Sequence, residues 1–138
     1  MASEPWFFDK LAEDVRLSGT IINDTLHGPD AVKAQISAVV ANYTDMTFAY
    51  QHDFADRRVE EYTATVAGRP ISGLGSFHFD EHGRIDEIVV DHRPLAAALT
   101  LSRLVGETEL GKAAPDRFYR PDGQSYADLL AYADAHAE

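Results

Sequence analysis

Apolar and polar side chains alternate with a period of two through the middle of the chain, and this alternation predicts long β-strands. The alternating segments are residues 47–54, 58–67, 71–79 and 84–93. Short turns join them, and glycines stand where a positive φ is expected, as in the sequence Asp80-Glu81-His82-Gly83. Four consecutive strands joined by short turns predict an antiparallel meander.

Helical spacing of apolar residues predicts the elements on either side of the meander. Before it we expect a short helix at residues 5–13, a strand at 15–23 and a helix at 30–42. After it we expect helices at 94–106 and 125–136, the first opened by a proline and closed by a glycine. The buried stripe of the helix at 30–42 is expected to consist of Val32, Ile36, Val39 and Val40. Helices together with an antiparallel sheet predict an α+β fold.

The region after residue 106 differs from the rest, because residues 107–123 are charged and rich in turn-forming residues. We therefore expect residues 1–106 to form one domain. Residues 107–138 are expected to form a C-terminal loop and an amphipathic helix that packs on the domain or on a second subunit.

Composition and charge exclude several kinds of chemistry and of binding partner for this protein. The 138 residues include no cysteine, which removes disulfide and thiolate chemistry. The net charge is −11, and a field of that sign repels nucleic acid and anionic lipid. The start of the chain lacks signal-peptide features, and no segment approaches the roughly 18 apolar residues of a membrane span. We expect a cytoplasmic protein with no nucleic-acid or membrane partner.

The alternation also predicts which side chains share a face, and we take the face with Ile88, Val90 and His92 as the inward one, although Val89 leaves the other face open. By the same argument apolar walls are expected from Trp6, Phe48, Phe54, Phe77 and Val90. Gly73 and Gly75 are expected to leave room for a ligand or to let their strand bend. If this face borders a cavity, as the family resemblance described below implies, the cavity suits a small apolar or amphipathic molecule.

The polar residues expected on the inward faces are His92, His52, Tyr50, Tyr62 and Glu60. A histidine positioned by a carboxylate is a competent general base, and a tyrosine donates to a developing oxyanion. The opposing interpretation is that these residues are solvated at the rim. His78 and His82 lie on a strand and a turn rather than on one helix face, so no metal site is expected, and no cofactor motif is present.

Several short motifs resemble those of the nuclear transport factor 2-like (NTF2-like) superfamily, in particular ketosteroid isomerases and SnoaL-like proteins. The motifs are Leu11-Ala12-Glu13-Asp14-Val15, His27-Gly28-Pro29-Asp30-Ala31-Val32, Ala67-Gly68-Arg69-Pro70 and Phe79-Asp80-Glu81-His82-Gly83-Arg84-Ile85. The resemblance implies a conical fold, in which a strongly bent antiparallel sheet carries helices on its concave face. It also implies a homodimer.

The resemblance does not extend to the isomerase chemistry. The positions that it implies for the aspartate base and the aspartic acid donor hold Gly19 and Gly75. The implied tyrosine falls where only Trp6, Phe7 and Phe8 stand. We therefore expect no steroid isomerisation by that mechanism.

Two classes of function stay open. The first is an isomerase, cyclase or hydrolase with His92 or His52 as base and Tyr50 or Tyr62 as donor. The second is a non-catalytic module for ligand binding, dimerisation or protein interaction.

Overall fold

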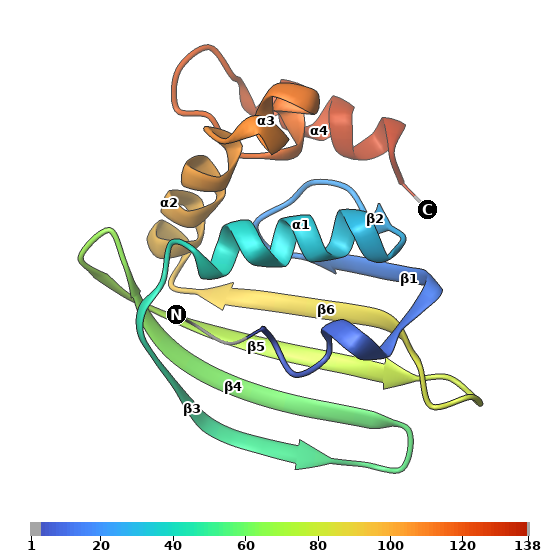
Figure 1. Ribbon diagram of the computed structural model, residues 1–138. Coiled ribbons are helices and arrows are strands. Elements are labelled where there is room, and N and C mark those ends of the chain that lie inside the picture. Colours follow the sequence, from blue (N-terminus) through green and yellow to red (C-terminus); the bar gives the residue numbers. More distant parts are fainter. Residues whose placement is uncertain (1–3, 138) are drawn as a thin grey trace.

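Six strands form one mixed, strongly curved sheet in the computed structural model, which describes residues 4–137 (Figure 1). The strands are β1 (Leu11–Gly19), β2 (Leu26–His27), β3 (Thr44–Asp53), β4 (Arg57–Val66), β5 (Arg69–Phe79) and β6 (Ile85–Arg93). Their order across the sheet is β2-β1-β6-β5-β4-β3. The predicted meander β3–β6 is confirmed. The pairing of β1 with β6 is parallel, so the sheet is mixed rather than wholly antiparallel.

The helices lie mainly on one side of this sheet. They are α1 (Pro29–Val40), α2 (Leu95–Gly106), α3 (Glu109–Ala113) and α4 (Tyr126–Ala135), with 3₁₀ turns η1 (Phe8–Lys10) and η2 (Pro115–Arg117). Helix α1 lies along the concave side of the sheet, and α2 leaves the end of β6 (Figure 1). No helix among the described residues is long and apolar enough to cross a membrane.

The predicted helix at residues 5–13 is wrong. Only the 3₁₀ turn η1 forms, and β1 already begins at Leu11, which pairs with Ile85 of β6. Three successive aromatic residues cause this, because Trp6, Phe7 and Phe8 pack on one another edge-on and both Trp6 and Phe7 also contact Phe77.

The strand predicted at residues 15–23 ends at Gly19. A Cβ atom at Gly19 would overlap the carbonyl oxygen of Val90, so only glycine allows this close approach of β1 to β6. The chain then leaves the sheet.

The C-terminal segment packs on the rest of the chain. The Arg117 Nε donates to both carboxylate oxygens of Asp24, at 2.8 and 3.0 Å, and the Tyr132 hydroxyl donates to the same carboxylate. Phe118 is completely buried. Helix α4 begins with a capping box in which Ser125 and Asp128 exchange hydrogen bonds. Residues 107–123, predicted as a loop, contain α3 and η2.

The turn between β4 and β5 contains a strained residue. Ala67 has φ of 49° and Gly68 has φ of 77°, so both central residues of this two-residue hairpin turn are left-handed. Asparagine adopts this conformation more readily than alanine. We expect Ala67→Asn to raise the free energy of unfolding by about 0.5–1 kcal/mol, as measured by urea denaturation. Ala67→Val is the opposing control, and equal stability of the two variants would contradict the argument.

Candidate functional site

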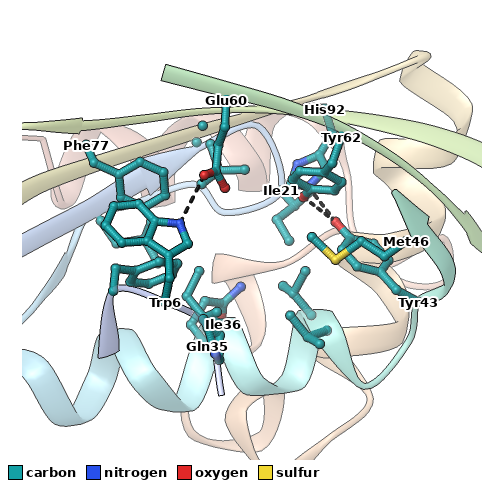
Figure 2. Close-up of a pocket in the computed structure, with 18 of the residues that line it drawn as sticks. Trp6, Ile21, Gln35, Ile36, Tyr43, Met46, Glu60, Tyr62, Phe77 and His92 are labelled. Atoms are coloured by element: carbon teal, nitrogen blue, oxygen red, sulfur yellow. Dashed lines mark hydrogen bonds between the residues drawn. The ribbon is translucent and has the colours of Figure 1, made fainter. Parts of the chain in front are cut away.

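A cavity of about 430 Å³ lies between α1 and the concave face of the sheet. Its walls are mostly apolar, and Figure 2 shows polar side chains entering from both sides. Four of the five residues expected as apolar walls line it, namely Trp6, Phe48, Phe77 and Val90. The fifth, Phe54, is 59% exposed and lies outside the lining.

Tyr50 and His52 also lie outside the cavity, contrary to the expected inward face. The cause is an irregularity in β3, where Phe48 pairs with Tyr62 but Tyr50 pairs with Glu61. The extra residue reverses the alternation beyond Phe48. Gln51 therefore comes opposite Glu60 and donates to it, but its side chain is exposed, as are those of Tyr50, His52 and Phe54. Sequence alternation alone cannot reveal a bulge.

Glu60 is the acidic group at one end of the cavity. It projects from β4, and its side chain is almost completely buried. Oε1 accepts hydrogen bonds from Trp6 Nε1 at 3.0 Å and from Gln51 Nε2 at 3.2 Å. Arg58 Nε lies 3.8 Å from the same oxygen, and its guanidinium stacks on the Trp6 ring. The carboxylate is thus held by one of its two oxygens, and it extends from the sheet into the cavity (Figure 2).

A cluster of two tyrosines and a histidine forms a second polar group. The Tyr43 hydroxyl lies 2.7 Å from the Tyr62 hydroxyl and 2.9 Å from His92 Nε2. The Tyr62 hydroxyl lies 3.1 Å from the same nitrogen. All three residues line the cavity. Tyr43 was missed by the sequence analysis because it stands in the connection between α1 and β3, where no periodicity assigns it to a face.

Gly73 makes this cluster possible. It lies on β5 between Tyr62 of β4 and His92 of β6, and it pairs with both. A Cβ atom at Gly73 would overlap the ring of Tyr62. The sequence analysis expected Gly73 to leave room for a ligand, but the ring of Tyr62 occupies that space. The ring crosses β5 there and reaches His92. Gly75 does line the cavity, as expected.

Burial keeps all three members of the cluster neutral. It lowers the pKa of His92 to about 4 and raises the pKa of Tyr62 to about 12. Burial, with the neighbouring Tyr62, raises the pKa of Tyr43 further. His92 is consequently a neutral hydrogen-bonding group at pH 7, not a charged one.

The hydrogen count in the cluster determines what it offers to a ligand. The Nδ1 atom of His92 is buried and has no partner among the described residues. Since an orphaned N–H is rarer than an orphaned acceptor, we place the proton on Nε2, which then donates to a tyrosine oxygen. One tyrosine donates to the other. The remaining O–H has no acceptor within the cluster and is free to donate to a ligand.

The two polar groups lie side by side on one strand. Glu60 and Tyr62 are two residues apart on the same face of β4, so their Cα atoms are about 6.6 Å apart. Within residues 4–137 no three His, Asp or Glu side chains gather closely enough to hold a metal ion. What the arrangement provides is a carboxylate and a neutral O–H donor facing one apolar cavity.

The three positions implied by the resemblance to ketosteroid isomerases all border this cavity, since Gly19, Gly75 and Trp6 line it. Gly19 has no room for a side chain. The acidic and hydroxyl groups of this chain therefore stand at other positions of the same surface.

Comparison with solved structures places the fold. The chain superposes with a TM-score of 0.71 on an uncharacterized protein with a cystatin-like fold from Silicibacter pomeroyi, at 21% identity over 78% of each chain. For a steroid delta-isomerase from Pseudomonas aeruginosa the TM-score is 0.70, at 23% identity over 78% of this chain and 80% of that one. An NTF2-like protein of unknown function from Burkholderia xenovorans gives 0.51, at 14% identity over 60% and 64%.

Sequence comparison adds no assignment, because no family model and no curated protein matches the chain. At these identities the structural likeness concerns the architecture and not the activity. The common architecture is the curved sheet with helices over its concave face. The chain has the fold of the NTF2-like superfamily.

Proposed function

We propose that this protein binds a small, largely apolar carbonyl compound and catalyses proton transfer at the carbon next to the carbonyl, as an isomerase or cyclase requires. The observation that carries the proposal is Glu60, a buried carboxylate in an apolar cavity beside a neutral O–H donor. Glu60 is the base. The free hydroxyl of the Tyr43–Tyr62 pair donates to the carbonyl oxygen as negative charge develops there.

This assignment changes the roles considered from the sequence. His92 holds the tyrosines through Nε2, and its pKa of about 4 makes it a weak base at neutral pH. His52 and Tyr50 take no part in this proposal, because their side chains are exposed outside the cavity. The donor is one of the pair Tyr43 and Tyr62, and Glu60 becomes the base rather than a group that positions a histidine.

The alternative is a module that binds the same class of molecule without turnover. In that case Glu60 only anchors Trp6, through the bond from Nε1 to Oε1. The two functions differ in whether a bound ketone exchanges its α-protons, and this difference can be measured without knowing the natural substrate.

The first prediction concerns this exchange. Simple ketones, with α-tetralone as the bicyclic example, are screened for binding through the fluorescence of Trp6, the only tryptophan of the chain. Bound ketones are then incubated in deuterium oxide, and NMR follows the loss of the α-proton signal. We expect the protein to accelerate exchange, and Glu60→Gln to lower the rate by about 100-fold or more while binding persists.

The matched control for this assay is Glu61→Gln. Glu61 is the neighbouring carboxylate, but it faces outward and binds Arg93 at 2.8 Å, so the variant keeps the exchange rate. Binding of ketones without exchange above the Glu60→Gln rate would support the binding module instead.

A second prediction concerns the neutral state of His92. Its pKa is about 4 in the folded protein, against 6.5 for a free imidazole. Between these values the unfolded chain binds a proton and the folded chain does not, so the free energy of unfolding falls as the pH drops from 6.5 to 4. The expected fall from this group is about 3 kcal/mol.

We expect His92→Asn to remove that part of the pH dependence, as measured by urea denaturation at several pH values. Parallel pH profiles for the two proteins would show that His92 is already charged in the folded state.

We also expect the protein to form a homodimer, as the fold resemblance implies. Large apolar side chains at Tyr50, Phe54 and Leu74 are 47%, 59% and 37% exposed, outside the cavity, and would support such an interface. Light scattering after size exclusion should give twice the monomer mass of 15.2 kDa. The double variant Tyr50→Glu, Leu74→Glu should give the monomer mass with unchanged ketone binding, and a monomeric wild type would refute the proposal.

A further inference from the structure

Gln35 is a polar residue in the apolar stripe of α1. It lies between Val32 and Val39, which are both buried against the core, and it is itself only 3% exposed. Among the residues that the structure describes, no hydrogen bond is made by its amide, whose atoms are not among the fully enclosed ones without a partner and therefore open to the cavity. Buried glutamines are uncommon, and those that occur are nearly always hydrogen-bonded. An apolar side chain at this position would fit the helix stripe better.

The Gln35 side chain borders the cavity from the helix side. It lies across the cavity from Glu60 and Tyr62, which enter from the sheet (Figure 2). The wall between them is apolar and includes Ile36, Phe48 and Phe77. A molecule that fills this space contacts polar groups at opposite ends and apolar groups between them.

The charged residues around the cavity restrict which chemical group of a ligand Gln35 can contact. No lysine or arginine lines the cavity within the described part of the chain, and the guanidinium of Arg58 stacks on Trp6 and already lies 3.8 Å from Glu60. A carboxylate or phosphate on the ligand would therefore be buried without a counter-charge, which is strongly unfavourable. A glutamine amide both donates and accepts, so it matches a neutral hydroxyl or amide group.

We infer that Gln35 is a ligand-binding residue that selects a neutral carbonyl compound with a second hydrogen-bonding group, a hydroxyl or an amide, at the end remote from the carbonyl. This inference deepens the proposed function and rests on it. It names neutral ketones with a second hydrogen-bonding group as the substrate class, in preference to keto acids and plain ketones.

The test uses α-tetralone and its derivatives with one hydroxyl, methoxy or carboxyl group at each position of the aromatic ring. Dissociation constants are measured by titration calorimetry for the wild type and for Gln35→Met, which keeps the length of the side chain and removes the amide. At least one hydroxyl isomer should bind the wild type about tenfold more tightly than α-tetralone and than the matching methoxy compound. The carboxyl compounds should bind most weakly.

In Gln35→Met the advantage of the hydroxyl isomer should disappear, while α-tetralone binds as well as before. Gln124→Met is the matched control, because Gln124 hydrogen-bonds to Arg120 and Phe118 in the C-terminal segment and does not line the cavity, so the preference for the hydroxyl persists there. Gln35→Met should also melt at the same temperature as the wild type or higher, because the amide has no partner to lose. A clear fall in melting temperature would show a structural role and overturn the inference.

The remaining outcomes distinguish the two proposals. If ketones bind and exchange their α-protons but no hydroxyl isomer gains affinity, or if the gain survives in Gln35→Met, the role of Gln35 is refuted and the proposed function stands. If the carboxyl compounds bind most tightly, the neutral substrate class is refuted. If no ketone binds at all, the proposed function itself fails.

Discussion

The contact of the Tyr62 ring with the bare backbone of Gly73 determines the polar chemistry of the cavity. Tyr62 stands on β4 and His92 on β6, so β5 lies between them. Only because Gly73 lacks a side chain does the phenol ring cross β5 and bring its hydroxyl within 3.1 Å of His92 Nε2. The hydroxyl of Tyr43 completes the cluster from the other side. Any side chain at position 73 would separate these groups.

The same contact explains why the cluster stays neutral. Once the ring of Tyr62 lies over β5, it shields His92 from water, and burial then lowers the imidazole pKa. With the proton of the neutral imidazole placed on Nε2, because Nδ1 is buried without a partner, Nε2 donates to a tyrosine oxygen. One of the two tyrosine O–H groups then has no acceptor within the cluster. The absence of a side chain at Gly73 thus leads to a free hydrogen-bond donor in the cavity. The carboxylate end depends on a different set of contacts, because Trp6 and Arg58 hold Glu60 from outside the cluster.

Sequence periodicity predicted the sheet well and the site only in part. The alternation in β4–β6 correctly placed Glu60, Tyr62, Phe77 and His92 on the face that borders the cavity, because those strands pair without interruption there. It failed for Tyr50, His52 and Phe54, because a single extra residue in β3 reverses the alternation. It could not find Tyr43, which lies outside any periodic segment. Gln35, in contrast, lies inside a periodic segment. A polar residue in an apolar stripe gives no sign of a function in the sequence, and only the structure shows the cavity beside it.

The position of the polar groups also bears on how this fold acquires function. The positions that the resemblance to ketosteroid isomerases implies all border the cavity, yet two of them are glycines, and Gly19 must remain one because β1 approaches β6 so closely. Backbone packing therefore excludes any side chain, and so any catalytic group, at position 19. The carboxylate stands instead on β4, where the alternation points it inward and where Trp6 and Gln51 supply two neutral donors to one oxygen. Two donors on one oxygen hold the carboxylate in place at the edge of a mostly apolar cavity, which is the position that the proposed base requires.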